Sequence, residues 1–308
     1  MWKKRRTREI RLGGLIIGGD RVPVVQSMAK TDTRDVSATI TQIRELEELG
    51  CEAIRVAVLD LEAAKAIGEI KKGIHIPLIA DIHFDPALAL ESIRSGADGI
   101  RINPGNIGGR EGLRKIVELA KGRGTAIRIG VNSGSLGREL LKKYSGPTPE
   151  AMVESALSFV KMVEEMEFFN LKISLKSSNV LDTVRAYELI SERLDYPLHI
   201  GITETGTLLP GTVKSAVGIS SILMKGIGDT IRVSLCSDPK YEIMVAYEIL
   251  RSLEIRKRGP ELIACPTCGR CEIDLQWLAQ EVEKRISDIK VPIKVAVMGC
   301  VVNGPGEA

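Results

Sequence analysis

Three cysteines near the C-terminus have the spacing of a metal site. Cys265 and Cys268 form a C-x-x-C turn in ELIACPTCGRC, and Cys300 follows the apolar run 295–298 in KVAVMGCVVNGPGE. Thiolates placed in this way bind zinc or an iron–sulfur cluster. Free cysteines are also often buried as small apolar side chains. The combined spacing favours a metal over buried thiols, and the residues alone leave the choice between zinc and iron open.

The composition is that of an intracellular enzyme. The 308 residues carry a net charge of +3, which gives no indication of a nucleic-acid or membrane partner. The basic N-terminus is followed by a short apolar run between glycines, unlike a secretory signal. No stretch approaches the roughly 18 apolar residues that cross a bilayer. We therefore expect a cytoplasmic protein without nucleic-acid or membrane partners, in which cysteine thiolates bind metal instead of forming disulfides.

Short β-branched runs alternate with amphipathic helical patterns along residues 20–252. The spacing predicts strands at 22–27, 53–58, 77–83, 99–103, 126–131, 171–176, 198–203 and 230–235. Eight strand–helix units in this length predict an α/β fold of the (β/α)8 TIM-barrel type. A doubly wound sheet is the alternative, but the glycine-rich turn typical of its first strand is missing. The opening segment REIRLGGLIIGGDRV predicts a hairpin that closes the barrel floor.

The side chains that point into the predicted barrel are unusually polar. Because side chains alternate between the two faces of a strand, the apolar residues of LKISLK face the helices and leave Lys172, Ser174 and Lys176 inward. The same argument turns further polar side chains inward on the other strands: Arg55, Asp81, His83, Arg101, Asn103, Arg128, Asn132, Arg232 and Ser234. A barrel interior is normally filled by branched apolar residues, so this pattern predicts a binding site.

Six of these inward side chains are cationic, and only Asp81 and Glu204, just past the seventh strand, oppose them. Unpaired buried charges cost several kcal/mol each. An anionic ligand such as a diphosphate is expected to complete the set, held by bidentate arginines at the carboxyl ends of the strands. The alternative is that some of these cations lie at the wet rims of the barrel or pair with carboxylates of the loops.

The motifs together are specific to one family. They are VQSM, ADIHFD, GIRINPGN, RIGVNSGSL, SLKSS, HIGITETG, IRVSL, CPTCGR and MGCVVNGPGE, in this order. The chain resembles the 4-hydroxy-3-methylbut-2-enyl diphosphate synthase family of the methylerythritol phosphate route to isoprenoids, over most of its length. The resemblance implies a reductive ring opening of 2-C-methyl-D-erythritol 2,4-cyclodiphosphate with loss of water. The electrons would come in two single steps from a ferredoxin or a flavodoxin.

The resemblance also assigns roles to residues. It implies a [4Fe-4S] cluster held by Cys265, Cys268, Cys300 and Glu307, in which the carboxylate is the exchangeable ligand because it is harder than thiolate. It makes Glu204 the acid that helps a hydroxyl leave as water. The residues expected to hold the diphosphate and the ring are Arg55, Asp81, Arg101, Asn103, Arg128, Asn132, Lys176, Arg232 and Ser234.

Two features depart from the family pattern. Cys271 extends the turn to C-x-x-C-x-x-C, so a cluster held by four cysteines, with Cys271 in place of Glu307, is an alternative. Such a cluster would leave no exchangeable iron position. The family also continues beyond the position of Ala308, from which we expect a cluster domain that is truncated or abbreviated. The expected domains are a barrel over 1–255 and a small α/β iron–sulfur domain over 256–308.

The chain is expected to act as a homodimer. The helix expected at about 240–252 returns to the barrel floor over about 18 Å, and the linker EIRKRGPE could barely retrace that distance. Each cluster domain would therefore cap the barrel of its partner, as in the family, and two-fold symmetry makes the exchange reciprocal.

Two other functions remain open from the residues. A pterin-binding barrel transferase resembling dihydropteroate synthases would share the polar strand ends, but it leaves the cysteines to a structural metal. A non-enzymatic binding module with structural zinc is the other alternative, and the brown colour of an iron–sulfur protein would distinguish the two metals.

Overall fold

The computed structural model describes residues 2–83, 85–103, 109–287 and 289–300. The chain forms two compact units, Met1–Ile249 and Leu250–Ala308, which are described separately below. The domain boundary at residue 255 remains a prediction.

The first unit is an α/β barrel. Its strands are β3 (Val24–Met28), β4 (Ala53–Ala57), β5 (Leu78–Asp81), β6 (Gly99–Ile102), β7 (Ala126–Asn132), β8 (Leu171–Lys176), β9 (His199–Ile200) and β10 (Thr230–Ile231). Within the described residues they form one parallel eight-stranded sheet in the order β8-β7-β6-β5-β4-β3-β10-β9. A bridge between Ile173 and Leu198 brings the two edges together. The predicted (β/α)8 barrel is confirmed.

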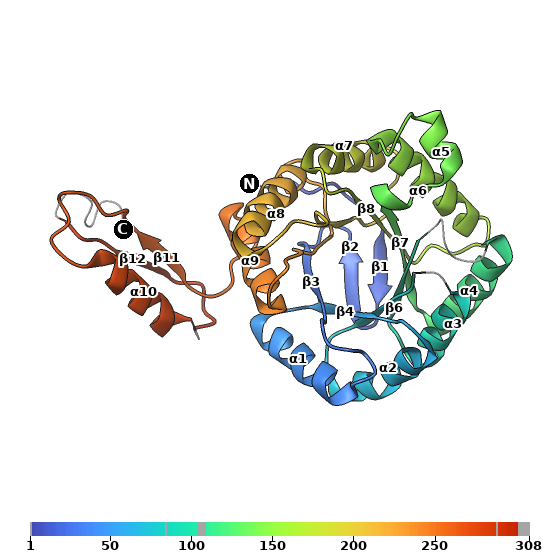
Figure 1. Ribbon diagram of the computed structural model, residues 1–308, viewed down its shortest axis with the longest axis horizontal. Coiled ribbons are helices and arrows are strands. Elements are labelled where there is room, and N and C mark those ends of the chain that lie inside the picture. The colour runs from blue at the N-terminus through green and yellow to red at the C-terminus, as the bar shows by residue number, and fades with distance from the viewer. Residues whose placement is uncertain (1, 84, 104–108, 288, 301–308) are drawn as a thin grey trace. The chain divides into compact units, whose positions relative to one another are not determined.

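Helices surround these strands, as Figure 1 shows. They are α1 (Val36–Leu49), α2 (Leu61–Gly73), α3 (Pro86–Arg94), α4 (Gly109–Arg123), α6 (Pro149–Glu164), α7 (Val180–Ser191), α8 (Leu208–Leu223) and α9 (Pro239–Ser252), with the short turn η1 (Ser133–Ser135) and helix α5 (Arg138–Lys143) after β7. Polar residues at the strand ends start several of them. Asp35 and Asp60 accept hydrogen bonds from the N–H groups of Ala38 and Ala63, which helix N-termini otherwise leave unsatisfied.

The last two barrel strands are shorter than predicted. Strands expected to run to residues 203 and 235 end at Ile200 and Ile231. Beyond these points the two segments bond to each other as loops, and the Cys236 N–H donates to the Gly206 carbonyl at 2.9 Å. The residues after β9 and β10 therefore form a joined pair of loops at the carboxyl ends of the strands.

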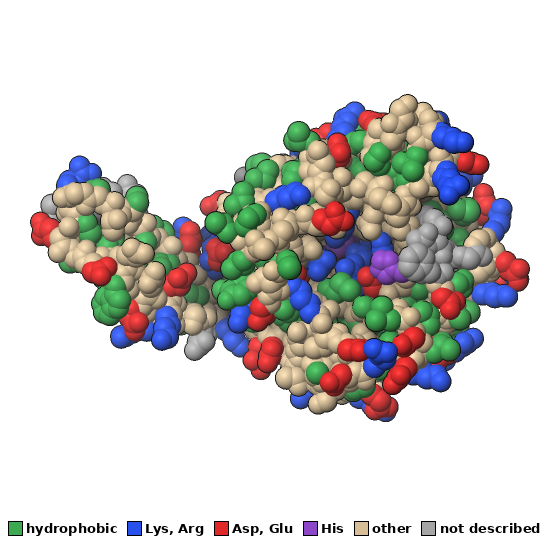
Figure 2. All heavy atoms as spheres, in the orientation of Figure 1, with side chains coloured by type: hydrophobic (Ala, Val, Ile, Leu, Met, Phe, Trp, Pro, Cys, Tyr) green, Lys and Arg blue, Asp and Glu red, His purple; other side chains and the backbone are tan. Residues whose placement is uncertain are grey.

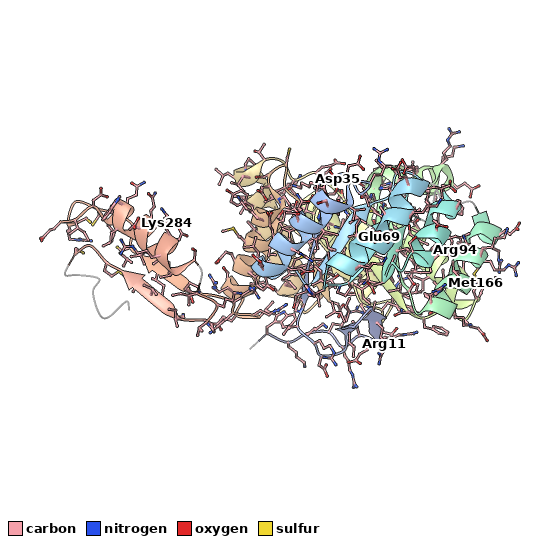
Figure 3. All side chains as sticks on the ribbon, turned by 90° about the horizontal axis from the view of Figure 1, so that it is seen from below. Arg11, Asp35, Glu69, Arg94, Met166 and Lys284 are labelled. Atoms are coloured by element: carbon pink, nitrogen blue, oxygen red, sulfur yellow. The ribbon has the colours of Figure 1, made fainter. Side chains whose placement is uncertain are left out.

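A hairpin closes the opposite end of the barrel, as predicted. Strands β1 (Glu9–Leu12) and β2 (Leu15–Gly18) pair antiparallel. Their buried side chains Ile10, Leu12 and Ile17 pack with residues at the starts of the barrel strands. Figure 3 shows the barrel from the side, with Arg11 of the hairpin at one end and Asp35, before α1, at the other. The hairpin thus covers the end of the barrel at which its strands begin.

One buried carboxylate ties the N-terminal segment to the barrel floor. Asp229 Oδ1 lies 2.7 Å from Lys4 Nζ and accepts a hydrogen bond from Thr7 Oγ1 at 2.9 Å. Its Oδ2 accepts from the backbone N–H of Leu198 at 2.8 Å. The segment before the hairpin is therefore held by charge and hydrogen bonds, not only by apolar packing.

We expect Asp229→Ala to lower the free energy of unfolding by about 3–5 kcal/mol, because it leaves the Lys4 ammonium buried without its carboxylate. Urea unfolding followed by circular dichroism measures the change. Asp195→Ala is the matched control, since the Asp195 carboxylate is 57% exposed and pairs with Arg8 on the surface. Exposed pairs contribute about 1 kcal/mol or less. Equal losses in the two variants would contradict the prediction.

The second unit is a small α/β fold. Strands β11 (Glu261–Ala264) and β12 (Lys294–Val297) pair in parallel, and helix α10 (Leu275–Ile286) connects them. The pairing joins Ala264 to Val297, so the chain leaves both strands at the same edge. Because Cys265 follows β11 and Cys300 comes shortly after β12, both approach that edge, as a shared metal site requires.

Candidate active site

The carboxyl ends of the barrel strands enclose a small cationic cavity of about 120 Å³. Its lining consists of Arg55, Asp81, His83, Arg101, Arg128, Asn132, Ser174, Lys176, Ile202, Thr203 and Arg232. Figure 2 shows Lys and Arg side chains deep in the hollow of the barrel unit, with a histidine at its edge. Strand alternation thus brings most of the predicted ligand-binding residues to one place. Their roles in binding remain predictions.

Asp81, at the end of β5, is the carboxylate at the centre of one side of the cavity. Its Oδ2 lies 3.5 Å from Arg55 Nε, and its Oδ1 accepts a hydrogen bond from Arg101 Nη1 at 3.3 Å. His83 Nε2 lies 3.5 Å from Oδ2. Burial acts to raise the pKa of Asp81, but Arg55, His83 and Arg101 outweigh it and hold the pKa far below its usual range. Asp81 is therefore a permanent anion that orients two arginines.

Arg128, the third residue of β7, makes no ion pair with a carboxylate among the described residues. Its side chain is buried, and neither Nε nor Nη1 has a hydrogen-bond partner within the part of the chain that the structure describes. Burial, together with Arg55 and Arg101, holds the pKa of Arg128 well below its usual value. Burial and the neighbouring Arg128 likewise lower the pKa of Lys176. The cavity therefore offers unused donors and excess positive charge, which an anion would satisfy.

A second carboxylate near the cations was missed by the sequence reasoning. Glu242, in the first turn of α9, is 1% exposed, and its Oε1 lies 3.5 Å from Arg232 Nη2 and 3.4 Å from Lys30 Nζ. A signal was available, because Glu242 precedes the buried residues Ala246 and Ile249 by one and two helical turns. It therefore occupies the core-facing side of its helix.

Asn103 and Ser234 lie outside the cavity lining. Asn103 is buried and donates from Nδ2 to Ser135 Oγ at 2.8 Å. Ser234 is half-buried, and its carbonyl oxygen accepts a hydrogen bond from Thr205 Oγ1. Their predicted contact with a ligand is not tested by these positions.

Glu204 lies at the rim, in the loop between β9 and α8. Its side chain is exposed, and it follows Thr203, which lines the cavity. Its backbone φ of 52° is left-handed, which is uncommon for a residue with a Cβ atom. Such conformations are concentrated at functional sites. The carboxylate is not part of the cavity lining, and the role of Glu204 as the acid stays a prediction.

Below the cavity, Lys172 is buried on β8, and its Nζ donates to Gln26 Oε1 at 3.4 Å. Burial and the neighbouring Arg128 lower the pKa of Lys172 to about 7. His199 is also fully buried there, with Nδ1 2.7 Å from Thr230 Oγ1. Burial and the surrounding cations keep the pKa of His199 well below its usual value, so the ring stays neutral at pH 7.

Anion affinity is expected to depend on the charge of Lys172. The group is protonated below its pKa of about 7, so its attraction for an anion is present at low pH and is lost as the pH rises through that value. We expect sulfate, whose charge is constant in this range, to bind roughly tenfold more weakly at pH 8 than at pH 6. Calorimetry measures the affinity. Lys172→Met should flatten the profile, Lys225→Met at the surface should not, and an unchanged slope in Lys172→Met would contradict the prediction.

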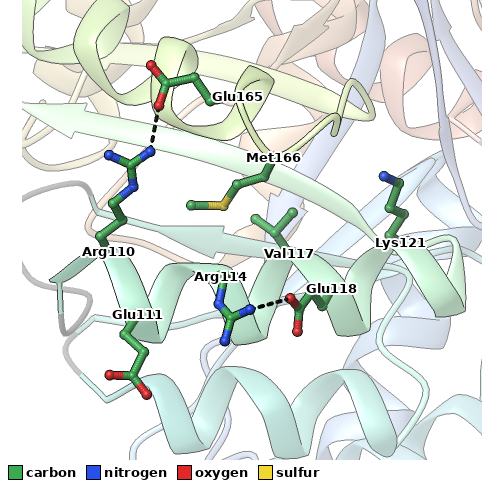
Figure 4. A pocket seen from close by; sticks show the side chains of 8 residues that line it. All are labelled: Arg110, Glu111, Arg114, Val117, Glu118, Lys121, Glu165 and Met166. Carbon is green, nitrogen blue, oxygen red and sulfur yellow. Dashed lines mark hydrogen bonds and ion pairs between the residues drawn. The ribbon is translucent and has the colours of Figure 1, made fainter.

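The barrel unit has two larger hollows, one on its outer surface and one beside the cationic cavity. A groove of about 670 Å³ runs along α4 and past the end of α6. Four of its charged side chains pair with one another, as Figure 4 shows: Arg110 lies 2.7 Å from Glu165, and Arg114 lies 3.2 Å from Glu118. A hollow of about 760 Å³ shares Asp81 and His83 with the cationic cavity. That second hollow widens the barrel mouth beside the cavity.

The cysteines of the second unit lie near the edge where β11 and β12 end. The Cys265 N–H donates to the Val297 carbonyl at 3.4 Å. Cys271 Sγ lies against Gly299, where an added methyl group would approach it to 2.5 Å. Among the described residues no three potential ligands are gathered as a metal site, and Glu307 lies outside those residues. The soft thiols near one strand edge nevertheless fit the donor set of an iron–sulfur cluster.

Similarity to known proteins identifies the family of this chain. Residues 7–247 match the GcpE TIM-barrel domain, and residues 261–308 match the GcpE protein C-terminal domain. The chain is 61% identical to the 4-hydroxy-3-methylbut-2-en-1-yl diphosphate synthase (flavodoxin) of Caldanaerobacter subterraneus subsp. tengcongensis, over 99% of this chain and 86% of that protein. The chain belongs to the 4-hydroxy-3-methylbut-2-en-1-yl diphosphate synthase family. The synthase (flavodoxin) of Nitratidesulfovibrio vulgaris is 58% identical, over 99% of this chain and 79% of that protein.

Membership of this synthase family makes the chain an enzyme and confirms the predicted resemblance. Solved structures of other enzymes share only the fold. Dihydropteroate synthase from Yersinia pestis superposes with a TM-score of 0.56 at 13% identity, over 80% of this chain and 98% of that chain. A type I 3-dehydroquinate dehydratase from Clostridium difficile gives 0.58 at 16%, with the same coverage. Likeness at such identities does not support the alternative of a pterin-binding transferase. None of the described helices is long and apolar enough to cross a membrane.

Proposed function

We propose that this synthase opens the ring of 2-C-methyl-D-erythritol 2,4-cyclodiphosphate and removes one hydroxyl as water, forming 4-hydroxy-3-methylbut-2-enyl diphosphate. Two electrons and one proton convert the cyclic dianion into the open-chain diphosphate trianion and water. The observation that carries the proposal is the excess of buried cations around the cavity, above all Arg128, whose Nε and Nη1 lack partners among the described residues. A diphosphate supplies both the charge and the acceptors.

The barrel residues bind and orient this ligand. Arg128, Lys176 and Arg232 would hold the phosphate oxygens, because they line the cavity and do not share Asp81, with which Arg55 and Arg101 pair. Arg232 is held from behind by Glu242. The remaining predicted residues would fix the ring: Asn132, Arg55, Asp81 and Arg101 from the cavity lining, with Asn103 and Ser234. Glu204 at the rim would deliver the proton to the departing hydroxyl, since a carboxyl group in contact with solvent can be reprotonated after each turnover.

The cysteine unit would hold a [4Fe-4S] cluster. Cys265, Cys268 and Cys300 are the proposed thiolate ligands and Glu307 the fourth, with Cys271 the alternative. When bound, the cluster supplies the two electrons one at a time. We propose a flavodoxin or a ferredoxin as the donor, and the names of the similar synthases specify a flavodoxin. A reducing cytoplasm would keep these thiols, which are at least partly exposed, available for iron.

The test is anaerobic turnover of the cyclodiphosphate by iron-loaded protein with a strong one-electron reductant, followed by mass spectrometry of the product. Formation of the open-chain diphosphate with loss of one oxygen is expected. Iron and sulfide analysis distinguishes the cluster from zinc. Protein that holds zinc alone, or that carries a cluster but leaves the cyclodiphosphate intact, would contradict the proposal.

We also propose a homodimer in which the cysteine unit of each protomer serves the barrel of the other. The support is the course of the chain, because α9 runs from the carboxyl ends of the strands back toward the floor, and the second unit begins in its last turn. In this arrangement a dimer has two sites, each made from both chains.

A mixed dimer tests this exchange. We expect a dimer of one Glu204→Gln chain and one Cys300→Ser chain to recover about half of the wild-type activity, because one of its two sites combines an intact barrel with an intact cysteine unit. Differently tagged chains allow the mixed dimer to be purified, and the two homodimeric variants are the controls. Activity no higher than in those controls would contradict the exchange.

A further inference from the structure

The carboxylate of Glu242 is saturated by donors from three segments. Oε1 accepts a hydrogen bond from the Leu235 N–H at 3.1 Å and lies within ion-pair distance of Arg232 and Lys30. Oε2 accepts a hydrogen bond from Ser27 Oγ at 3.0 Å. With the side chain 1% exposed, this arrangement has no freedom to reorient. The charge of Glu242 is therefore fixed in place behind the cationic cavity.

Arg232 links the carboxylate of Glu242 to the cavity. Arg232 lines the cavity and contacts Glu242 through Nη2, at 3.5 Å from Oε1. Its Nε is buried without a hydrogen-bond partner among the residues described. Asp81 forms corresponding ion pairs with Arg55 and Arg101, which also line the cavity. Each of the two carboxylates thus anchors guanidinium groups at the cavity. Arg55 and Arg101 also donate to Met28 Sδ and to the Gly130 carbonyl, whereas Arg232 Nε has no such partner in the described part of the chain.

The same carboxylate also fixes the loop after β10. It binds the backbone at Leu235, and Lys30 Nζ donates to the Leu235 carbonyl at 2.8 Å. This loop in turn supports the loop that carries Glu204, since Thr205 Oγ1 donates to the Ser234 carbonyl and the Cys236 N–H donates to Gly206. A shift at Glu242 would therefore move both the cation and the rim of the cavity.

We propose that Glu242 is a positioning residue of the diphosphate site, which holds Arg232 so that its Nε is left for the ligand. The inference rests on the proposed function only for the class of ligand, an anion with diphosphate geometry. Glu242 acts through Arg232 and does not contact the ligand itself.

The test is a double-mutant cycle read by calorimetry with inorganic pyrophosphate, which requires neither the cluster nor turnover. We expect Glu242→Gln to weaken pyrophosphate binding about tenfold, because an arginine that loses its charged partner presents its donors less well. In an Arg232→Met background the same substitution should change the affinity less than about twofold, since the residue through which it acts is gone. Equal losses in both backgrounds would overturn the proposal.

Ser27→Ala is the matched control, because it removes the contact to Oε2 and leaves the side that faces Arg232 intact. It should lower the thermal midpoint without changing pyrophosphate affinity more than about twofold. A loss of affinity as large as in Glu242→Gln would assign Glu242 a general structural role and overturn the proposal. If Glu242→Gln does not fold, Glu242→Asp keeps the charge with a shorter reach, and the same cycle with Arg232→Met decides the question. A failure of cyclodiphosphate turnover with an intact cycle would count against the proposed function alone.

Discussion

Arg128→Met is expected to weaken diphosphate binding at least about a hundredfold. Hydrogen bonds to a charged group contribute about 1.5–3 kcal/mol each, and Arg128 has two buried donors without partners among the described residues. The same substitution should raise the free energy of unfolding by about 1–3 kcal/mol, since it removes a buried cation that makes no ion pair with a carboxylate of the described residues and replaces it with an apolar side chain of similar length. Opposite signs for binding and stability are the signature of a residue retained for its ligand.

Calorimetry with pyrophosphate and urea unfolding measure the two effects on the same preparations. Arg114→Met is the control, because Arg114 is 60% exposed and pairs with Glu118 along α4. It should leave pyrophosphate affinity unchanged and alter stability by less than about 1 kcal/mol. If Arg128→Met lost stability and kept its affinity, Arg128 would be a structural residue and the cavity would need another explanation.

The barrel and its polar interior could be predicted because both depend on local patterns. In LKISLK, the three aliphatic residues can be buried against helices only if the two lysines and the serine face the barrel axis. The structure places Ser174 and Lys176 in the cavity lining and Lys172 below it. The hairpin was predictable for the same reason, since its apolar residues Ile10, Leu12 and Ile17 must be covered by something, and the open floor is the nearest apolar surface.

Counter-charges were harder to predict because they come from distant parts of the chain. Glu242 contacts Arg232 from the helix that follows β10. Ser27, on β3, and Lys30, in the loop after β3, contact the same carboxylate. Such pairing depends on how far each side chain extends in three dimensions, which strand alternation does not specify. Assigning only Asp81 and Glu204 to the cations therefore left out the carboxylate that contacts Arg232.

The ends of β9 and β10 illustrate a second limit. Both sequences alternate well beyond the residues that pair as strands, but the backbone leaves the sheet to form the joined loops that carry Glu204 and Ser234. Tertiary hydrogen bonds, such as the one from Cys236 to Gly206, outweigh the local preference for extended structure. The rim of the site is therefore set by contacts between loops, whereas its walls are set by the strands.

The geometry of the rim leads to an equally large effect on the chemical step. We expect Glu204→Gln to lower kcat by about 10²- to 10³-fold and to change pyrophosphate affinity little, because the side chain lies outside the cavity lining and would act as an acid. Glutamine matches glutamate in size and adopts the left-handed backbone at this position no less readily. A structural cost is therefore not expected.

Single-turnover measurements with iron-loaded protein separate binding from chemistry, and Glu165→Gln on the outside of the barrel is the control. The prediction requires the loss to be confined to the chemical step. If pyrophosphate affinity fell along with kcat, Glu204 would hold the ligand and another group would have to protonate the leaving oxygen. Thr203 lines the cavity and Thr205 Oγ1 donates to the Ser234 carbonyl, so Glu204 lies between a cavity residue and a residue anchored to the neighbouring loop. As the proposed acid, Glu204 would combine access to solvent protons with a defined position at the rim of the cavity.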